Sequence, residues 1–185
     1  MTRSLEGLWE GIPVLARAAL DPMKRGVREA VFLDKASLRP AAARLAEEGY
    51  HLEDVTGLDW TEGFEVLYHF CLEAPGSRIV LRVLASHESP EVPSISDIAP
   101  GALWHERECF DFFGVVFSGH PGLWPILLPD DLGMHPLVKS ENSRMSLYAC
   151  LEGYPELPAV QGEMYGFEPI PAKAEGGAHE PKANG

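Results

Sequence analysis

The sequence lacks closely spaced cysteines. Its three cysteines, Cys71, Cys109 and Cys150, lie far apart and form no CxxC pair. Zinc ribbons and cysteine-bound iron–sulfur clusters are therefore poorly supported, because both need several thiolates at short spacings. An odd number of cysteines also argues against a disulfide framework, so we expect a reducing, cytoplasmic compartment.

Basic residues are also scarce. The chain carries 15 Lys and Arg against 28 Asp and Glu, which gives a formal net charge of -13. No run of Lys or Arg forms a local basic patch, and an acidic surface of this kind repels nucleic acid. The charge balance instead favours basic protein partners.

Long apolar runs and nucleotide-binding motifs are missing too. Residues 1–19 contain apolar pairs, but Glu6, Glu10, Pro13 and Arg17 interrupt them, so we expect neither a signal peptide nor a membrane span. The sequence contains no GxGxxG and no GxxxxGKS/T, the glycine-rich signatures of dinucleotide and nucleotide-phosphate sites. We expect a soluble protein that reaches a membrane only through a partner.

The sequence does contain enough apolar material for one folded domain. Of its 185 residues, 45% are hydrophobic and 9% aromatic, which predicts a single domain with extensions. We assign residues 1–26 to an N-terminal arm, with a short helix over residues 14–20 that Asp21-Pro22 ends. Residues 27–139 are predicted to form the domain itself.

Hydrophobic periodicity predicts the first elements of this domain. Residues 29–34 are a short apolar run that is typical of a strand. Residues 38–48 read as a helix, because Leu38, Ala42 and Leu45 recur at helical spacing and share one face.

Two further segments, residues 64–72 and 78–85, alternate apolar and polar positions with a period of two. A short turn separates them, so we predict an antiparallel hairpin. The polar residues 51–60 are predicted as a turn-rich loop, and residues 101–113 as a helix that Gly114 stops. The predicted fold class is α+β, a mostly antiparallel sheet packed with helices and followed by an extended C-terminal arm.

Prolines divide the C-terminal segment. Residues 140–171 combine many prolines with apolar side chains that follow neither a helical nor a strand period. We predict an extended partner-binding arm there, because burial against another protein would offset the entropic cost of ordering it. The polar residues 172–185 are predicted to be a disordered tail.

Residues 103–139 concentrate ionisable and structure-breaking residues. The helical part carries four consecutive ionisable groups at residues 105–108, and Arg107 and Asp111 are spaced i,i+4, close enough to pair. On this pattern alone the segment is a surface helix with salt bridges, each of which contributes little to stability.

Two His-Pro pairs, His120-Pro121 and His135-Pro136, follow that helix. Proline fixes its own φ and biases the preceding histidine towards extended backbone, so each pair forms a rigid corner that carries an imidazole. Such corners suit holding a loop in one shape, and they also suit metal binding or acid–base work.

The motif residues of this stretch stand in a fixed order: Glu106, Arg107, Glu108, Asp111, Gly114, Phe117, Gly119, His120, Pro121, Leu123, Ile126, Leu127, Gly133, His135, Pro136, Leu137 and Lys139. This order resembles the hallmark stretch of the 30 kDa (C-type) subunit family of NADH:quinone oxidoreductase, respiratory complex I. Residues 54–59 and 92–95 match the same family upstream, and the resemblance covers residues 27–140.

The resemblance implies a peripheral-arm subunit of a proton-translocating NADH:quinone oxidoreductase. Such a subunit carries no catalytic residue, cofactor or metal of its own and supports the adjacent quinone-cavity (D-type) subunit. Iron–sulfur clusters, quinone and FMN or NADH would belong to that partner and to neighbouring iron–sulfur subunits. The motif residues would bind partners, and the complex would place the chain at the cytoplasmic side of the inner (plasma) membrane.

The sequence departs from the family pattern in two places. Trp124-Pro125 stand where basic residues are usual, and Val138-Lys139-Ser140 replace an Arg-Lys-Asp sequence. The lost positive charge changes the usual partner contacts. It motivates an alternative, the equivalent subunit of a complex-I-like membrane-bound nickel–iron hydrogenase, with the nickel–iron large subunit as the partner.

Two alternatives come from other classes of protein. A free-standing metallohydrolase would use His105, Cys109, His120 and His135, of which the first two are spaced i,i+4 on the predicted helix. A cysteine beside Phe110, however, is more often a small core residue. The other alternative is a generic acidic adaptor outside any redox complex.

Overall fold

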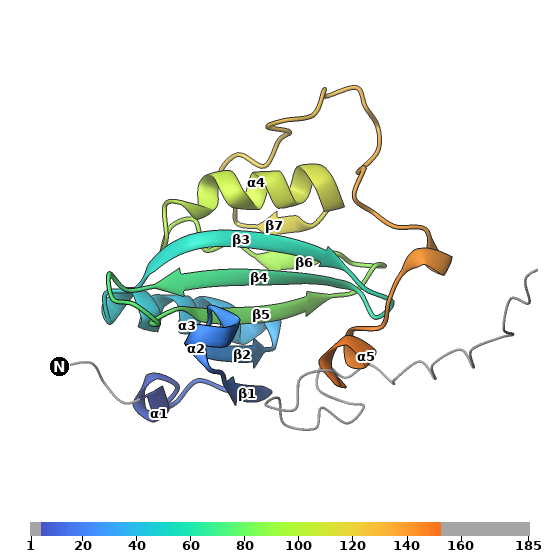
Figure 1. Ribbon diagram of the computed structural model, residues 1–185. Helices are drawn as coiled ribbons and strands as arrows, with labels where there is room; N and C mark the ends of the chain where they lie inside the picture. The colour runs from blue at the N-terminus through green and yellow to red at the C-terminus, as the bar shows by residue number, and fades with distance from the viewer. Residues whose placement is uncertain (1–4, 153–185) are drawn as a thin grey trace, which may run out of the picture.

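A five-stranded sheet forms the centre of the computed structural model, which describes residues 5–152 (Figure 1). The sheet has the order β1-β2-β5-β4-β3, with β1 at Ala16–Ala19, β2 at Glu29–Leu33, β3 at His51–Asp59, β4 at Phe64–Cys71 and β5 at Ile79–Ala85. β2 and β5 are parallel, and the other neighbouring pairs are antiparallel. This confirms the α+β class, the mostly antiparallel sheet and the predicted hairpin.

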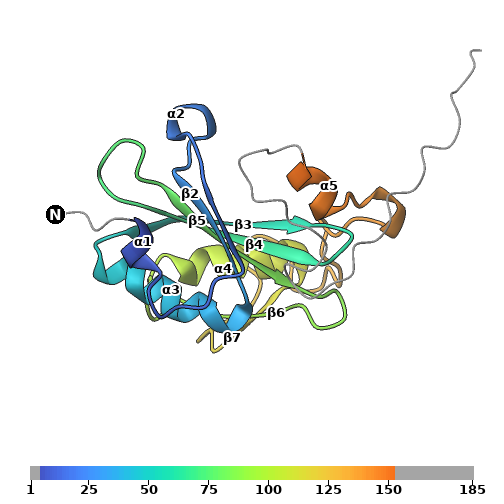
Figure 2. The same ribbon diagram turned by 90° about the horizontal axis from the view of Figure 1, so that it is seen from below.

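Helices and a second, smaller sheet cover one face of the large sheet, called here the inner face (Figure 2). The helices are α3 (Lys35–Glu47) and α4 (Ala102–Phe113), and the small sheet pairs β6 (Glu91–Pro93) with β7 (Val116–Ser118) in parallel. The short helix α1 (Leu5–Leu8) is attached to α3, because the Arg44 guanidinium donates to the Leu8 carbonyl at 3.1 Å.

The periods of strand and helix explain how the inner face is filled. Alternate residues of a strand point to the same face, and β4 contributes the fully buried Tyr68 and Phe70 in this way. On α3 the fully buried Leu38, Ala42 and Leu45 form the facing stripe, as predicted. The helix begins earlier than expected, because Asp34 caps it by accepting the Ala36 N–H at 2.9 Å.

Among residues 5–152, fewer elements cover the opposite, outer face of the sheet (Figure 2). The short helix α5 (Leu147–Glu152) packs there with Leu147 and Leu151 against the buried Phe32 and Trp60. The one-turn helices α2 (Pro22–Arg25) and η1 (Glu141–Ser143) lie in the connections. Within residues 5–152 no helix has the length and apolar character needed to cross a bilayer.

Two segments differ from the sequence-based predictions. Residues 14–20 are not helical but contain β1, because pairing with β2 gives this backbone its partners, starting with Leu15 N–H to Phe32 O at 2.8 Å. Residues 51–60 are not a loop but contain the longest strand, β3. This strand lies at the edge of the sheet, where polar side chains remain in water, and so it lacks the apolar alternation that marks β4.

The C-terminal segment also differs from the prediction where it is described. The extended arm was expected from residue 140, but residues 147–152 form α5, whose Leu147 is fully buried and Leu151 is 4% exposed. Glu62 makes this helix start possible by accepting the Leu147 N–H at 2.8 Å. The rest of the predicted arm, residues 153–171, and the predicted tail, residues 172–185, lie outside the described residues.

Candidate partner-binding loop

Helix α4 carries much of the motif and is bounded by glycines. Gly114 ends it in the left-handed conformation, with a φ of 74° and its N–H donated to the Phe110 carbonyl at 2.8 Å. Glycine enters this region without strain, which explains the predicted stop. The helix packs closely on β3 at Gly57, where an added Cβ would lie 2.8 Å from the Cys109 Sγ.

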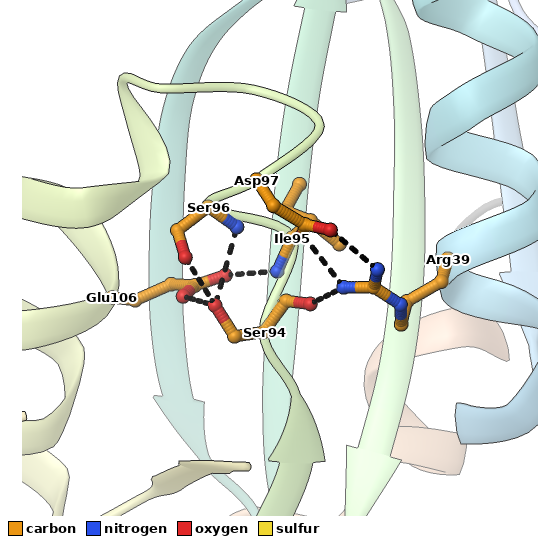
Figure 3. Close-up of polar contacts among 6 residues, drawn as sticks. All are labelled: Arg39, Ser94, Ile95, Ser96, Asp97 and Glu106. Carbon is orange, nitrogen blue, oxygen red and sulfur yellow. Dashed lines mark hydrogen bonds and ion pairs between the residues drawn. The ribbon is translucent and has the colours of Figure 1, made fainter. Parts of the chain in front are cut away.

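Glu106 is fully buried on the face of α4 that meets the core. Its Oε2 accepts the Ser94 hydroxyl at 2.5 Å, and its Oε1 accepts the Ile95 N–H at 2.9 Å (Figure 3). The hydroxyl oxygen of Ser96 lies 2.8 Å from that of Ser94. Residues 94–97, which follow β6, are thereby fastened to α4.

Arg39 of α3 holds the same segment from the other side (Figure 3). Its guanidinium donates to both carboxylate oxygens of Asp97, at 2.8 and 2.7 Å, and to the Ser94 carbonyl. A bidentate contact of this kind fixes geometry as well as charge. The segment 94–97 therefore ties α3 to α4 across the inner face.

Burial controls the protonation of Glu106. Removal from water raises the pKa of this carboxyl from 4.5 to about 7, against the opposing effect of the Ile95 and Ser94 hydrogen bonds. Near it, the buried Tyr68 hydroxyl has no hydrogen-bond partner among the described residues. Burial first, and the Glu106 charge second, raise the pKa of Tyr68. Glu106 is thus a core carboxyl that titrates near neutral pH.

Arg107 and Asp111 bind the loop of residues 119–146, which connects β7 to α5 and is called here the braced loop. The Asp111 Oδ2 accepts three successive backbone N–H groups, from residues 126–128, at 3.1, 2.8 and 3.0 Å. The Arg107 guanidinium donates to the Trp124 and Pro125 carbonyls at 3.0 and 2.9 Å. The expected pairing of Arg107 with Asp111 does not form, because both side chains are engaged by the loop.

Asp111 is an ionised group that the loop covers. Burial alone would raise the pKa of this carboxyl, since it is 3% exposed. The three backbone N–H donors, together with the nearby His135, outweigh that effect and hold the pKa of Asp111 below its ordinary 3.8. Successive N–H groups that converge on one oxygen form a nest for an anion.

The two His-Pro corners attach the braced loop to both ends of α4. His120 Nε2 lies 3.2 Å from the Leu103 carbonyl, and its Nδ1 accepts the Gly122 N–H at 3.0 Å, a pattern that fits the tautomer with its proton on Nε2. His135 donates from Nδ1 to the Asp111 carbonyl at 2.8 Å. That carbonyl lies in the last turn of α4, where the helix itself supplies no donor. Both corners thus fasten the loop to α4, which is consistent with the first of the roles that the sequence left open.

Two buried carboxylates hold the far end of the braced loop. Asp59, at the end of β3, accepts the Lys139 N–H at 2.7 Å and the Arg144 guanidinium at 3.0 Å. Glu62 accepts the Leu147 N–H at 2.8 Å and so fixes the point where the loop enters α5. Asp111 thus attaches the loop to the core near its middle, and Asp59 and Glu62 attach it near its end.

Between these attachments the braced loop exposes apolar side chains. Trp124 and Leu127 are 59% and 62% exposed, and the neighbouring Trp104 of α4 is 62% exposed. The Arg107 guanidinium lies over both indole rings, 5.4 Å from the centroid of Trp104 and 5.2 Å from that of Trp124. Further exposed apolar residues on the loop are Leu132, Met134, Leu137, Val138 and Met145. Several exposed large apolar side chains on one loop make it a candidate interaction surface.

The motif residues have different structural roles in α4 and the braced loop. Some hold chain segments directly through their side chains: Glu106, Arg107, Asp111, His120 and His135. Others shape the backbone, since Gly114 and Gly119 have φ of 74° and 84° and the exposed Pro121 and Pro136 complete the corners. Lys139 contributes its N–H to Asp59 and places Nζ 5.9 Å from the Trp60 ring centroid, whereas Glu108 faces solvent.

The four candidate metal ligands are not brought together. His105 lies 3.5 Å from Asp54, and Cys109 is buried against β3, where burial raises its pKa to about 12. His120 and His135 contact backbone carbonyls at opposite ends of α4. Within residues 5–152 no group of three or more His, Cys, Asp or Glu is arranged to hold a metal ion. This geometry argues against the metallohydrolase.

Sequence reasoning missed Asp59, Glu62 and Ser94 as site residues. Asp59 and Ser94 belong to the upstream segments that resemble the family, and that resemblance was the available signal. Their partners lie far away in the chain, as with Asp59 and Lys139, and no local pattern predicts such a contact. For Glu62 we find no signal in the sequence.

The fold and the braced loop define the protein as an α+β domain of a known architecture. The same architecture occurs in a solved structure described as the membrane-bound sulfane sulfur reductase, an archaeal respiratory membrane complex. The match has a TM-score of 0.62 and covers 81% of this chain and 88% of that one. At 23% sequence identity it shows the shared fold alone.

Sequence comparison identifies the family. The family described as the respiratory-chain NADH dehydrogenase, 30 Kd subunit, matches residues 31–146, and the chain belongs to this family. It is 49% identical over 94 residues to the C-type subunit of the NADH-quinone oxidoreductase of Roseiflexus castenholzii, a match that covers 49% of this chain and 54% of that protein. The chain therefore spans about half the length of the Roseiflexus relatives that it matches.

A relative in Bacteroides fragilis has a different chain organisation. It is named as the C/D-type subunit of NADH-quinone oxidoreductase and is 35% identical over 130 residues. The match covers 63% of this chain but 24% of that protein, so the region similar to this chain is a part of a longer polypeptide.

Proposed function

We propose that the chain is a non-catalytic peripheral-arm subunit of a proton-translocating NADH:quinone oxidoreductase, and that its braced loop binds the adjacent quinone-cavity subunit. The observation that carries this proposal is the contrast within the loop. Buried carboxylates fix its backbone, while Trp124, Leu127 and Met134 stay at least half exposed. Family membership supports the choice of complex, and the braced loop supports the location of the contact surface.

The physics of association favours such a surface. A loop that is already held in place loses little conformational entropy when a partner binds, so more of the contact energy remains as affinity. Tryptophan and arginine are the residues that most often dominate interface energies. Here Arg107 lies between Trp104 and Trp124, at the side of the loop that α4 supports.

The organisation of a relative supports a D-type subunit as the partner. In Bacteroides fragilis the matching region belongs to a protein whose name joins the C and D types, and a single polypeptide keeps its parts at a high effective concentration. In this proposal the iron–sulfur clusters, quinone and FMN or NADH belong to partner subunits. The chain positions its neighbour and contacts the membrane, on its cytoplasmic side, only through the complex.

A second candidate is the equivalent subunit of a complex-I-like membrane-bound nickel–iron hydrogenase. The observation behind it is the exposed Trp124, which stands with Pro125 where basic residues are usual in the family. An apolar side chain at this place favours a partner surface that is less acidic there. The two candidates differ in the partner that the same loop meets.

Affinity purification from membranes of the native host tests the proposal. We expect the tagged full chain to elute with a quinone-cavity subunit and iron–sulfur subunits, and to carry NADH:quinone activity that the isolated chain lacks. The double variant Leu127→Glu, Met134→Glu should lose these partners, because it places charge in the apolar contact. Met23→Glu is a matched control, since Met23 is 91% exposed on α2, outside the loop.

The partner composition decides between the candidates. Nickel in the purified complex, measured by elemental analysis, would indicate the hydrogenase instead. Elution of the full chain without any redox subunit would refute both, and equal recovery of partners by the loop variant and the wild type would refute the role of the braced loop.

A further inference from the structure

The outer face of the sheet contains a groove that is separate from the braced loop. It has a volume of about 530 Å³, and the sheet lines it mainly with apolar side chains from β2, β3, β4 and β5, namely Ala30, Leu58, Leu67 and Val80. His69 of β4 and Arg82 of β5 line it as well. Lys24 and Arg25 of α2 stand at its rim. We call it the outer groove.

The described chain ends at the wall of this groove. Cys150 and Leu151 of α5 line it, and α5 ends at Glu152. The next residues therefore start beside the outer groove. An extended chain advances about 3.3 Å per residue, so a few residues are enough to reach the floor.

The composition of the following segment complements the groove. Residues 153–168 contain six large apolar side chains well suited to an apolar floor: Tyr154, Leu157, Val160, Met164, Tyr165 and Phe167. The same residues include Glu156, Glu163 and Glu168 but no Lys or Arg. Lys24 and Arg25 line the same groove as the end of α5, so their charge is complementary to that of the segment that follows.

The prolines of the segment add a constraint on how it binds. Pro155 and Pro158 lack an N–H and fix φ, so this stretch pairs poorly with a strand and does not continue a helix. A groove made by side chains accepts such a segment without backbone pairing. The outer groove is of that kind, because it lies on the face of the sheet and not at its edge.

We propose that residues 154–168 bind in the outer groove of the same chain, with apolar side chains on its floor and glutamates towards the Lys24 side. This contact would complete the core on the outer face. It is independent of the proposed function, because it uses neither the braced loop nor a partner. Two alternatives compete with this proposal. Residues 154–168 would bind another subunit, as the predicted partner-binding arm implies, or they would bind a second copy of this chain.

Hydrogen exchange of the full chain tests this proposal. We expect the amides of residues 154–168 to exchange at least tenfold more slowly than an unstructured peptide of the same sequence, in a dilute monomer without partners. Leu67→Glu should remove this protection by placing a charge on the floor of the outer groove. Lys24→Glu should reduce it severalfold by opposing the acidic segment. The Lys24 side chain is 80% exposed, and its ion pair with Asp21 at 3.9 Å is a surface contact that contributes little to stability.

Lys35→Glu is the matched control, since it makes the same charge change at the start of α3 on the other face. We expect it to leave the exchange of residues 154–168 unchanged. Exchange at the unstructured rate in the wild-type monomer would overturn the proposal. Protection that appears only with added partner subunits, that rises with chain concentration, or that both groove variants retain would overturn it as well.

Discussion

The imidazole of His135 fills the space that a side chain at Gly114 would need. A Cβ built on Gly114 would lie 2.7 Å from His135 Cδ2 and 2.9 Å from its Nε2. Glycine is thus required twice at this position, for its positive φ of 74° and for the close approach of the second His-Pro corner. The end of α4 and the position of the braced loop therefore depend on the same residue.

This relationship predicts different costs for two glycine substitutions. In Gly119→Ala the added Cβ has no other atom within 4 Å, so the only cost is the strain of the positive φ. We expect it to lower the free energy of unfolding by about 1–2 kcal/mol. Gly114→Ala adds the collision with His135, so we expect a further loss of about 1–3 kcal/mol. Urea denaturation of both variants measures the difference. Equal stability of the two would show that the ring moves away freely.

Asp111→Ala should release the middle of the braced loop. Three N–H groups lose their shared acceptor, and we expect a loss of about 3 kcal/mol in stability. The amides of residues 126–128 should exchange at least tenfold faster. Asp111→Asn should lie between the variant and the wild type, because an amide oxygen still accepts but carries no charge. Asp130→Ala, at an exposed position of the same loop, is the control. Unchanged exchange in Asp111→Ala would contradict the nest.

Glu106 should make the protein less stable as the pH rises towards neutrality. Its pKa is raised from 4.5 to about 7, so between these values the folded state holds a proton that the unfolded state has released. The contribution of Glu106 to the free energy of unfolding is present in full below about pH 4.5. It falls by about 3 kcal/mol by pH 7, at about 1.4 kcal/mol per pH unit.

Comparison with Glu106→Gln isolates this effect. The amide keeps the size of the side chain, and the Ser94 hydroxyl can donate to it or accept from it, so the variant should lack this part of the pH dependence. We expect its stability relative to the wild type to increase from pH 5 to pH 8 in urea denaturation. Glu108→Gln, on the exposed side of α4, should follow the wild type at each pH. Parallel curves for the wild type and Glu106→Gln would disprove the buried titration.

The elements that the sequence predicts well are those whose own pattern decides their packing. β4 and α3 present complete apolar stripes to the inner face, and their periods of 2 and 3.6 residues are visible without any other information. β3 and β1 were missed for the opposite reason. Both lie at the edges of the sheet, and their pairing depends on neighbours that a local pattern does not reveal.

The site was predictable as a stretch of sequence but not as a set of contacts. The motif between residues 106 and 139 identified the helix and the braced loop through the family resemblance. The spacing of Arg107 and Asp111 predicted that they pair, whereas both bind the loop. A carboxylate such as Glu106 also gives no sign in the sequence that it is buried, because the Ser94 and Ile95 groups that compensate it come from another segment.

Asp59 has a consequence for assembly that goes beyond its hydrogen bonds. It stands at the end of the edge strand β3, yet it holds Lys139 and Arg144, near the end of the braced loop. A chain in which β3 has not joined the sheet lacks Asp59 as a fixed point for that part of the loop. In the proposed complex, a subunit that recognises this part of the loop would therefore reject chains whose edge strand has not yet joined the sheet, without any separate check.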